Sequence, residues 1–326
     1  MIPRGLLLAR RRLLQAVPVL VFVILGTFLL LEIAPGDAVD AYLAGAGGGG
    51  SAGFAEQLRL EWGLGGSPAT RLVAYLAKLA TFDLGWSVTF SRPVAAVIAD
   101  RMVNTLLLMT AAIFFAVSLG ILLGTMAALK AGSLRDTLLV AGSMVLNAAP
   151  GFWLGLMMIV LFAVKLGWFP SGGLMAVGGS PSLVERVADI AWHLVLPVAT
   201  LALTYLALYL RLMRAAMLEA GRSDYVRSAL AKGLSRRRIV WRHMARNAVL
   251  PVATMIGLQA SGLLGGSVVI ETVFAIPGMG RLAYEAVTQR DLPLLLGVIL
   301  SSAVVVILAN LLLDQIYARL DPRIGA

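Results

Sequence analysis

Six long apolar runs determine what this chain can fold into. Each run has about 19 or more predominantly apolar residues, so each could cross the roughly 30 Å hydrocarbon core of a bilayer as a helix. Only 13% of the 326 residues are charged, about half of the ~25% that a soluble domain carries. The sequence therefore predicts an all-α polytopic membrane protein with six transmembrane helices, and it excludes a soluble enzyme or a disordered chain. We place the spans at residues 13–34, 103–129, 137–164, 193–213, 248–275 and 294–318.

The placement of basic residues predicts the orientation of these spans. With the N-terminus in the cytoplasm, 18 of the 27 Lys and Arg residues lie in the cytoplasmic segments, as the positive-inside rule requires. Six spans then put both termini in the cytoplasm. The basic balance of the chain is therefore a sign of topology and not of nucleic-acid binding. The first span follows Arg10–Arg12 and is longer than the apolar core of a signal peptide, which has about 7–15 residues, so we expect a retained anchor.

The spans divide the chain into three predicted regions. Residues 1–34 hold a basic segment and the first transmembrane helix. Residues 35–100 form an extracytoplasmic segment, in which apolar and polar residues mix at helical spacing over 54–62 and 68–80, so we expect short helices there. Residues 101–326 hold a core of the other five helices, with the loop 211–247 between two of them.

The side chains needed for most catalytic and metal chemistry are missing from the sequence. The chain has no cysteine, and its two histidines, His193 and His243, are fifty residues apart, so we expect no catalytic residue and no metal site. No Gly-x-x-x-x-Gly-Lys-Ser/Thr segment occurs, so the chain itself has no phosphate-binding loop for ATP and is not an enzyme. Charged residues lie near the ends of the spans, which argues against an ion-coupled carrier. Any transport would be driven by a partner.

Glycine and polar residues inside the spans predict a packed bundle. Gly-x-x-x-Gly spacing occurs at 120–124, 151–155 and 262–266, which favours close approach of helices. Pro150 lies within the third span and should kink it. Four polar side chains either face a transport pathway or form interhelical hydrogen bonds, and both interpretations stay open: Ser143, Asn147, Gln259 and Ser261.

The loop between the fourth and fifth spans, residues 211–247, has ten basic and two acidic residues and is called the basic loop below. Ser223 is a suitable N-cap for a short helix, and Gly233 can adopt the left-handed conformation that ends one. Four apolar residues share one stripe of this predicted helix: Tyr225, Val226, Ala229 and Leu230. The stripe needs a partner, either lipid headgroups or the groove of a cytoplasmic protein.

The segment Asp224–Leu234, followed by Arg242–His243 and Arg246–Pro251, resembles the cytoplasmic loop of ABC importer permeases. More narrowly, it resembles the first permease subunit of the dipeptide, oligopeptide and nickel group. Short segments in the order typical of that group extend the resemblance over nearly the whole chain: 34–37, 83–87, 92–94, 150–155, 271–274, 277–282 and 321–323.

This resemblance implies a type I ABC importer permease-like fold in the bacterial inner membrane, surrounded by lipid. It implies a second, related permease, two cytoplasmic ATPases that bind ATP and Mg, and an extracytoplasmic substrate-binding protein; no cofactor is expected in this chain. An ATPase would couple to the loop helix through its residues Asp224, Tyr225, Val226, Ala229, Leu230, Ala231, Lys232, Gly233 and Leu234.

The resemblance also indicates a function. Short peptides are the leading substrate, while nickel chelates and other small solutes stay open; an ion-coupled secondary carrier and a membrane scaffold are the distant alternatives. An outer gate or receptor contact is predicted near the fifth span, although a simple Pro-Gly turn before a surface helix explains the same residues: Phe274, Pro277, Gly278 and Arg281.

Overall fold

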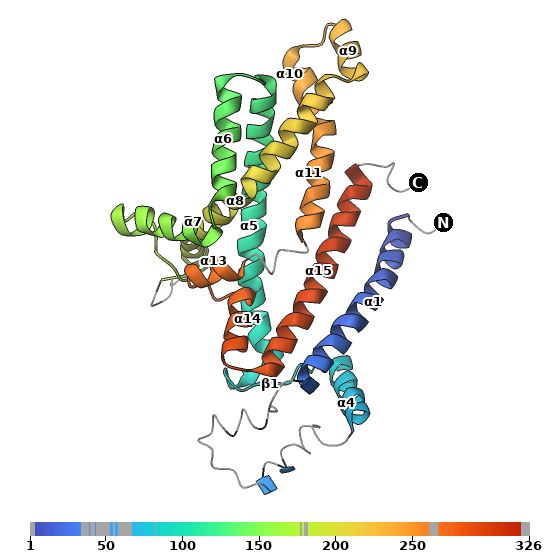
Figure 1. The fold of residues 1–326 in the computed structure, drawn as a ribbon, viewed down its shortest axis with the longest axis vertical. Helices are drawn as coiled ribbons and strands as arrows, with labels where there is room; N and C mark the ends of the chain where they lie inside the picture. Colours follow the sequence, from blue (N-terminus) through green and yellow to red (C-terminus); the bar gives the residue numbers. More distant parts are fainter. Residues whose placement is uncertain are drawn as a thin grey trace. The chain divides into compact units, whose positions relative to one another are not determined.

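The fold is helical almost throughout (Figure 1). A computed structural model of the chain describes residues 4–33, 39, 43, 53–54, 56–57, 67–81, 83–176, 178, 182–260 and 267–320. Its elements, with π-helical segments labelled η, are α1 (Arg4–Ile33), α4 (Pro68–Ala80), β1 (Trp86–Ser87), β2 (Arg92–Pro93), α5 (Val94–Leu129), α6 (Leu134–Ala148), α7 (Gly151–Met158), η1 (Ile159–Lys165), α8 (Leu183–Gly221), α9 (Asp224–Ala231), α10 (Arg236–Arg238), η2 (Ile239–Met244), α11 (Ala245–Ala260), α13 (Val268–Val273), α14 (Met279–Thr288) and α15 (Leu292–Leu320). The chain divides into two compact units, Met1–Thr105 with Gly278–Leu311 and Leu106–Pro277 with Leu312–Ala326.

Helix α8 is the centre of the second unit. Helices α6, α7, α11 and α13 all pack against it. Tyr209, Met213 and Met217 of α8 are fully buried among apolar residues of α5, η2 and α11. A second core is built around Leu108 and Phe274. The helices of this unit therefore pack around one long continuous helix.

Two glycines let α5 approach α8 closely. A Cβ atom at Gly120 would lie 2.5 Å from the Cβ atom of Tyr209, and one at Gly124 would lie 2.6 Å from the carbonyl oxygen of Leu210. No larger residue fits at either position without a shift of the helix backbone. The close approach predicted from the 120–124 spacing is confirmed, whereas the 262–266 pair lies outside the described residues.

The third predicted span, 137–164, is wrong in its shape. Helix α6 and the helix formed by α7 and η1 are bent by 102° at their junction, which is far more than a kink. Pro150 is the N-cap residue of α7, and Ala149 before it is extended, with ψ of 130°. Because a proline disfavours the helical conformation in the residue before it and has no N–H to donate, Pro150 ends α6 here.

Three described helices are long and apolar enough to cross a membrane: Val94–Leu129, Leu183–Gly221 and Leu292–Leu312. The bent pair of α6 with α7 and η1 makes a fourth if it counts as one span, and α1 contains a shorter apolar stretch, Val17–Leu30. In the predicted span 248–275, α11 ends at Ala260 and α13 begins at Val268, with residues between them outside the described part of the chain.

The first unit holds the predicted extracytoplasmic segment. Helix α4 coincides with the expected helix 68–80, and Ser67 caps it by accepting a hydrogen bond from the Thr70 N–H. It lies along α1, where Arg71 pairs with Glu32. The other helix that we predicted, 54–62, falls mostly outside the described residues.

A buried carboxylate joins the β1–β2 hairpin to the start of α15. Asp291 Oδ2 accepts hydrogen bonds from Ser87 Oγ at 2.6 Å and from the Thr89 N–H at 3.1 Å. Its Oδ1 accepts the Leu294 N–H at 3.2 Å and thereby caps α15. One side chain therefore fixes both the hairpin and the beginning of a long apolar helix.

Candidate functional site

The candidate site is the basic loop, in which the short helix forms as predicted. Helix α9 begins after Ser223, the predicted N-cap residue, although the Ser223 hydroxyl donates to the Ala220 carbonyl of α8 and accepts no capping hydrogen bond from α9. Gly233 has a φ of +71°, the left-handed conformation that we expected to end the helix. The Leu234 N–H then donates to the Ala229 carbonyl at 3.3 Å and closes the turn.

The inner face of α9 is buried within its own chain. Val226 and Ala229 pack with Ile239 at the start of η2, and Leu234 and Met244 complete this cluster. The sequence suggested that the apolar stripe needs an external partner. For these two residues that expectation is wrong, because the chain turns back at Gly233 and brings Ile239 onto them.

The outer face of α9 is open to solvent. Leu230 is 59% exposed and Tyr225 is 40% exposed, so these two apolar members of the stripe remain available for contact. Asp224, Ala231 and Lys232 are also exposed. Among the nine predicted coupling residues, Val226 and Ala229 are therefore buried within the chain. Tyr225 and Leu230 belong to the face that is open to solvent.

The loop is attached to the helical bundle at both ends. Upstream, α8 leads into α9 through Arg222 and Ser223. Downstream, η2 continues directly into α11, and Val240 and Ala245 pack against Met213 and Met217 of α8. Both ends of the loop are therefore joined to α8 and α11 through buried side chains.

An ion pair holds the end of α8 that forms the first part of the basic loop. Arg214 Nε and Nη2 donate to Asp136 Oδ1 and Oδ2 at 2.6 and 2.7 Å, so α8 and α6 are joined by a bidentate pair. Asp136 Oδ2 also accepts the Gly132 N–H at 2.9 Å, which ties in the turn before α6. Sequence reasoning missed this pair, since its members are 78 positions apart; the one available signal was an acidic residue beside Lys130 and Arg135 in a basic turn.

The four pathway candidates do not share one environment. Ser143 is buried, and its hydroxyl donates to the Val140 carbonyl of its own helix at 2.8 Å. Asn147 is exposed at the end of α6, next to the bend, and Gln259 is partly buried near the end of α11. Ser261 lies outside the described residues.

The gate candidates surround a tight turn. Phe274 is 1% exposed and belongs to the core, and its carbonyl accepts the Gly173 N–H at 2.8 Å. Pro277 is partly buried, and Gly278 is the N-cap residue of α14. Arg281 Nε donates to Glu285 Oε1 at 2.8 Å along one face of α14.

Long apolar helices and a short helix held in a basic loop between two of them are features of the membrane component of a transport system. The chain belongs to the family of binding-protein-dependent transport system inner membrane components, whose model matches residues 120–326. It is thus a permease of the inner membrane and not itself an ATPase.

Relatives match the chain over nearly its full length. A Brucella abortus protein assigned as a peptide transport system permease is 38% identical over 96% of this chain and 97% of its own length. The oligopeptide transport system permease protein AppB of Bacillus subtilis is 35% identical over 96% of this chain and 98% of its own length. The dipeptide transport system permease protein DppB of Alkalihalophilus pseudofirmus is 34% identical, with 97% and 98% covered.

One solved structure shares the fold. A chain of the MetNI methionine ABC transporter, in inward-facing conformations, has a TM-score of 0.53 and 17% sequence identity. The likeness covers 70% of this chain and 97% of that chain. The helical arrangement described above is therefore that of an ABC importer permease.

Proposed function

We propose that this chain forms half of the translocation pathway for short peptides in an ABC importer whose partner ATPases supply the energy. The observation that carries the proposal is the match to permeases named for peptide, oligopeptide and dipeptide transport, over 96–97% of this chain. A match of that extent includes both the helical core and the predicted extracytoplasmic segment. Nickel chelates or another small solute are the alternative cargo for the same architecture.

The proposed assembly has this chain beside a second, related permease, above two ATPases that bind ATP and Mg, and below a substrate-binding protein. In it the chain crosses the membrane six times with both termini in the cytoplasm. Residues 1–34 contribute the first span, 35–100 the extracytoplasmic segment and 101–326 the permease core. The Lys and Arg distribution supports this orientation.

The basic loop is the proposed coupling element. An ATPase would contact the exposed face of α9, where Tyr225 and Leu230 offer apolar surface between polar neighbours. Closure of the ATPase pair on ATP would displace α9. Because Val226 and Ala229 are packed on Ile239, the displacement would reach η2 and α11 as well as α8.

Two substitutions in α9 test this coupling. Leu230→Asp should reduce the amount of ATPase that copurifies with the permease at least tenfold and should abolish uptake, without lowering the thermal midpoint of the permease. Arg227→Gln is the matched control, because Arg227 is exposed on the same helix and forms only a 3.6 Å surface pair with Asp224. Normal ATPase copurification and uptake by Leu230→Asp would contradict the proposal.

The pathway and gate residues can be tested because the chain has no native cysteine. Single cysteines at Asn147, Gln259 and Ser261 should react with a membrane-impermeant maleimide, and added peptide substrate should slow the reaction. A cysteine at Ser143, which is buried, should not react. A cysteine at Val145, which is 70% exposed on α6, is the lipid-facing control and should not react. Cysteines at Pro277 and Arg281 should react more slowly when the binding protein is docked.

The substrate is tested in the reconstituted importer. Uptake of radiolabelled dipeptides to pentapeptides is compared with uptake of a nickel chelate. The vesicles hold ATP in their lumen, and the ATPases face that lumen. Peptide uptake that depends on ATP and on the binding protein supports the proposal. Uptake of the nickel chelate alone, or uptake driven by an ion gradient without ATPases, would overturn it.

A further inference from the structure

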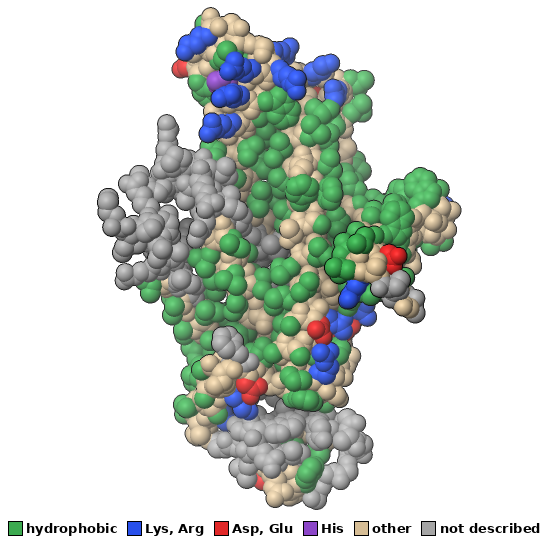
Figure 2. All heavy atoms as spheres, turned by 180° about the vertical axis from the view of Figure 1, so that it is seen from behind, with side chains coloured by type: hydrophobic (Ala, Val, Ile, Leu, Met, Phe, Trp, Pro, Cys, Tyr) green, Lys and Arg blue, Asp and Glu red, His purple; other side chains and the backbone are tan. Residues whose placement is uncertain are grey.

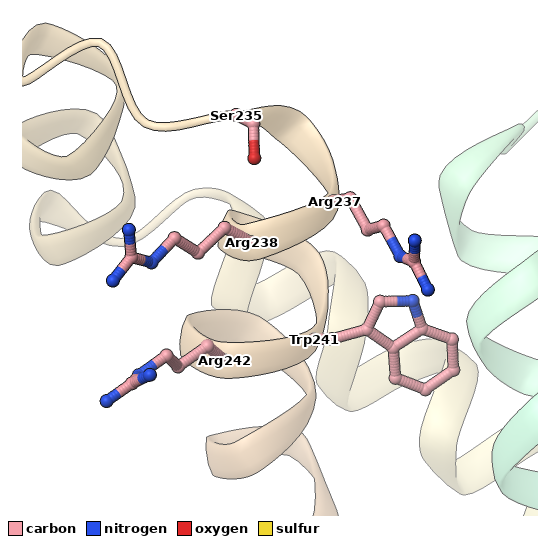
Figure 3. A pocket seen from close by; sticks show the side chains of 5 residues that line it. All are labelled: Ser235, Arg237, Arg238, Trp241 and Arg242. Carbon is pink, nitrogen blue, oxygen red and sulfur yellow. The ribbon is translucent and has the colours of Figure 1, made fainter.

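A basic pocket lies on the surface immediately after the turn at Gly233 (Figure 3). It is lined by Ser235, Arg237, Arg238, Trp241 and Arg242 and has a volume of about 430 Å³. Figure 3 shows Arg238 and Arg242 on one side of the helix and Arg237 and Trp241 on the other. Each pair is separated by four residues, so its members are neighbours along one helix face.

The positive charge of this pocket is uncompensated. Arg237, Arg238 and Arg242 are exposed, and among the described residues none of them forms an ion pair with a carboxylate. The Ser235 side chain makes no capping hydrogen bond to α10, although it stands at the N-cap position. Three guanidinium groups and a hydroxyl are thus free to donate hydrogen bonds to an anion.

The pocket lies at the end of the membrane-crossing bundle. Val240 and Ala245, which flank Trp241, are buried against Met213 and Met217 in the last turns of α8, one of the helices long enough to cross a membrane. Figure 2 shows Lys and Arg side chains gathered over this end of the unit, next to α9 and α10, with an apolar flank beyond them. The arginines therefore stand where an apolar surface gives way to a charged one. With the apolar stretch of α8 in the hydrocarbon, this boundary would lie at the depth of lipid headgroups.

An exposed tryptophan at that depth points to lipid. Trp241 is 50% exposed beside the arginines. Tryptophan is enriched at membrane interfaces, where the indole ring lies among the headgroups, and planar guanidinium groups bind phosphate oxygens in pairs. A docking site for an acidic protein would explain the arginines but gives no reason for an exposed indole at the apolar boundary.

We propose that Ser235, Arg237, Arg238, Trp241 and Arg242 form a binding site for the headgroup of an anionic phospholipid. The arginines donate hydrogen bonds to the phosphodiester, and the indole packs beside the glycerol and the first acyl carbons. The site would anchor the downstream end of the basic loop to the bilayer, just before α11. It is separate from the exposed face of α9 and does not depend on the substrate of the importer.

Native mass spectrometry of the full-length permease in detergent tests this site. Added palmitoyl-oleoyl phosphatidylglycerol should bind at least about tenfold more tightly than the matching phosphatidylcholine, which has no net charge. The triple variant Arg237→Gln, Arg238→Gln, Arg242→Gln should lose this preference to within about twofold. Arg236→Gln is the matched control: Arg236 belongs to the same arginine triplet but does not line the pocket, so the preference should remain.

A second measurement uses the unmodified arginines. Phosphatidylglycerol brominated at the first acyl carbons should quench wild-type tryptophan fluorescence more than brominated phosphatidylcholine does, and Trp241→Phe should remove the difference. The proposal is overturned if wild type shows no preference, or if the triple variant keeps it. Displacement of the lipid by an equal concentration of inorganic phosphate would assign the site to a free anion. A triple variant that retains the lipid but loses the ATPase would assign it to protein docking.

Discussion

Arg214 of α8 holds Asp136 of α6 with two parallel hydrogen bonds, and the Asp136 side chain is 4% exposed. The same carboxylate accepts the Gly132 N–H, so the turn that follows α5 is fixed by it as well. The turn, α6 and α8 therefore share one charged contact. Arg214 lies in α8 one turn beyond Leu210. At Leu210, Gly124 lets α5 approach α8 closely.

Breaking this pair should destabilise the permease strongly. Arg214→Gln should lower the free energy of unfolding by about 3 kcal/mol, because it leaves Asp136 as a buried and uncompensated charge. Asp136→Asn should cost less, because the Arg214 side chain that it leaves unpaired is partly exposed. Thermal unfolding in detergent measures the loss. Asp224→Asn, which removes a fully solvated partner from Arg227, is the control and should cost less than about 0.5 kcal/mol. The double variant Asp136→Asn, Arg214→Gln is the further test. A loss in it equal to the sum of the two single losses would show that the two side chains do not interact.

Even a single methyl group at Gly120 or Gly124 should disrupt the α5–α8 contact. Gly120→Ala and Gly124→Ala should each cost roughly 1–3 kcal/mol, since the added Cβ would overlap α8 and the helices would have to separate. The yield of folded protein and its thermal midpoint report this cost. Gly142→Ala is the matched control on α6, where an added Cβ meets nothing within 4 Å, and it should be neutral or stabilising. Equal behaviour of the three variants would refute the assigned packing.

The cost of a substitution at Gly233 should depend on how readily the new residue adopts a positive φ and not on the size of its side chain. An added Cβ meets nothing within 4 Å, but the φ of +71° is unfavourable for most residues. Gly233→Val should cost about 1–2 kcal/mol and release Ile239 from α9, whereas Gly233→Asn should cost less, because Asn visits the left-handed region more readily. ATP-dependent uptake and the protease resistance of the basic loop should both fall further in Gly233→Val than in Gly233→Asn. Greater damage from Asn than from Val would contradict this assignment.

Removing the Asp291 carboxylate should loosen the β1–β2 hairpin. In Asp291→Ala the Ser87 hydroxyl and the Thr89 N–H lose their acceptor, and α15 loses its cap, which is worth about 1 kcal/mol by itself. Hydrogen–deuterium exchange should become faster at Thr89 and in the first turn of α15. Asp100→Asn is the control, since Asp100 pairs with Arg92 on the surface. Unchanged exchange at Thr89 would mean that the hairpin is held by other contacts.

Local signals in the sequence predicted those parts of the fold that neighbouring residues determine. The Gly120 and Gly124 spacing indicated a close helix contact, and Ser223 and Gly233 marked the ends of the loop helix. Pro150 was identified correctly as a disturbance, but its effect was underestimated: a kink requires the helix to continue beyond the proline, and here the preceding residue is already extended.

Contacts between distant residues could not be predicted in the same way. The partner of Val226 and Ala229 is Ile239, which follows a turn whose direction depends on the conformation of Gly233. The Arg214 partner is 78 positions away, and the position of Asp136 in a basic turn does not indicate which arginine binds it. Periodicity identifies which residues of a helix are apolar, but the tertiary structure decides which of them are already covered.

The burial of Val226 and Ala229 on Ile239 has a consequence for the speed of assembly. A protein that binds α9 meets a helix that is already ordered, so the conformational entropy of folding the loop is not lost at the moment of binding. Association then requires no folding of the loop, so its rate constant should exceed that of a segment that must become ordered on binding.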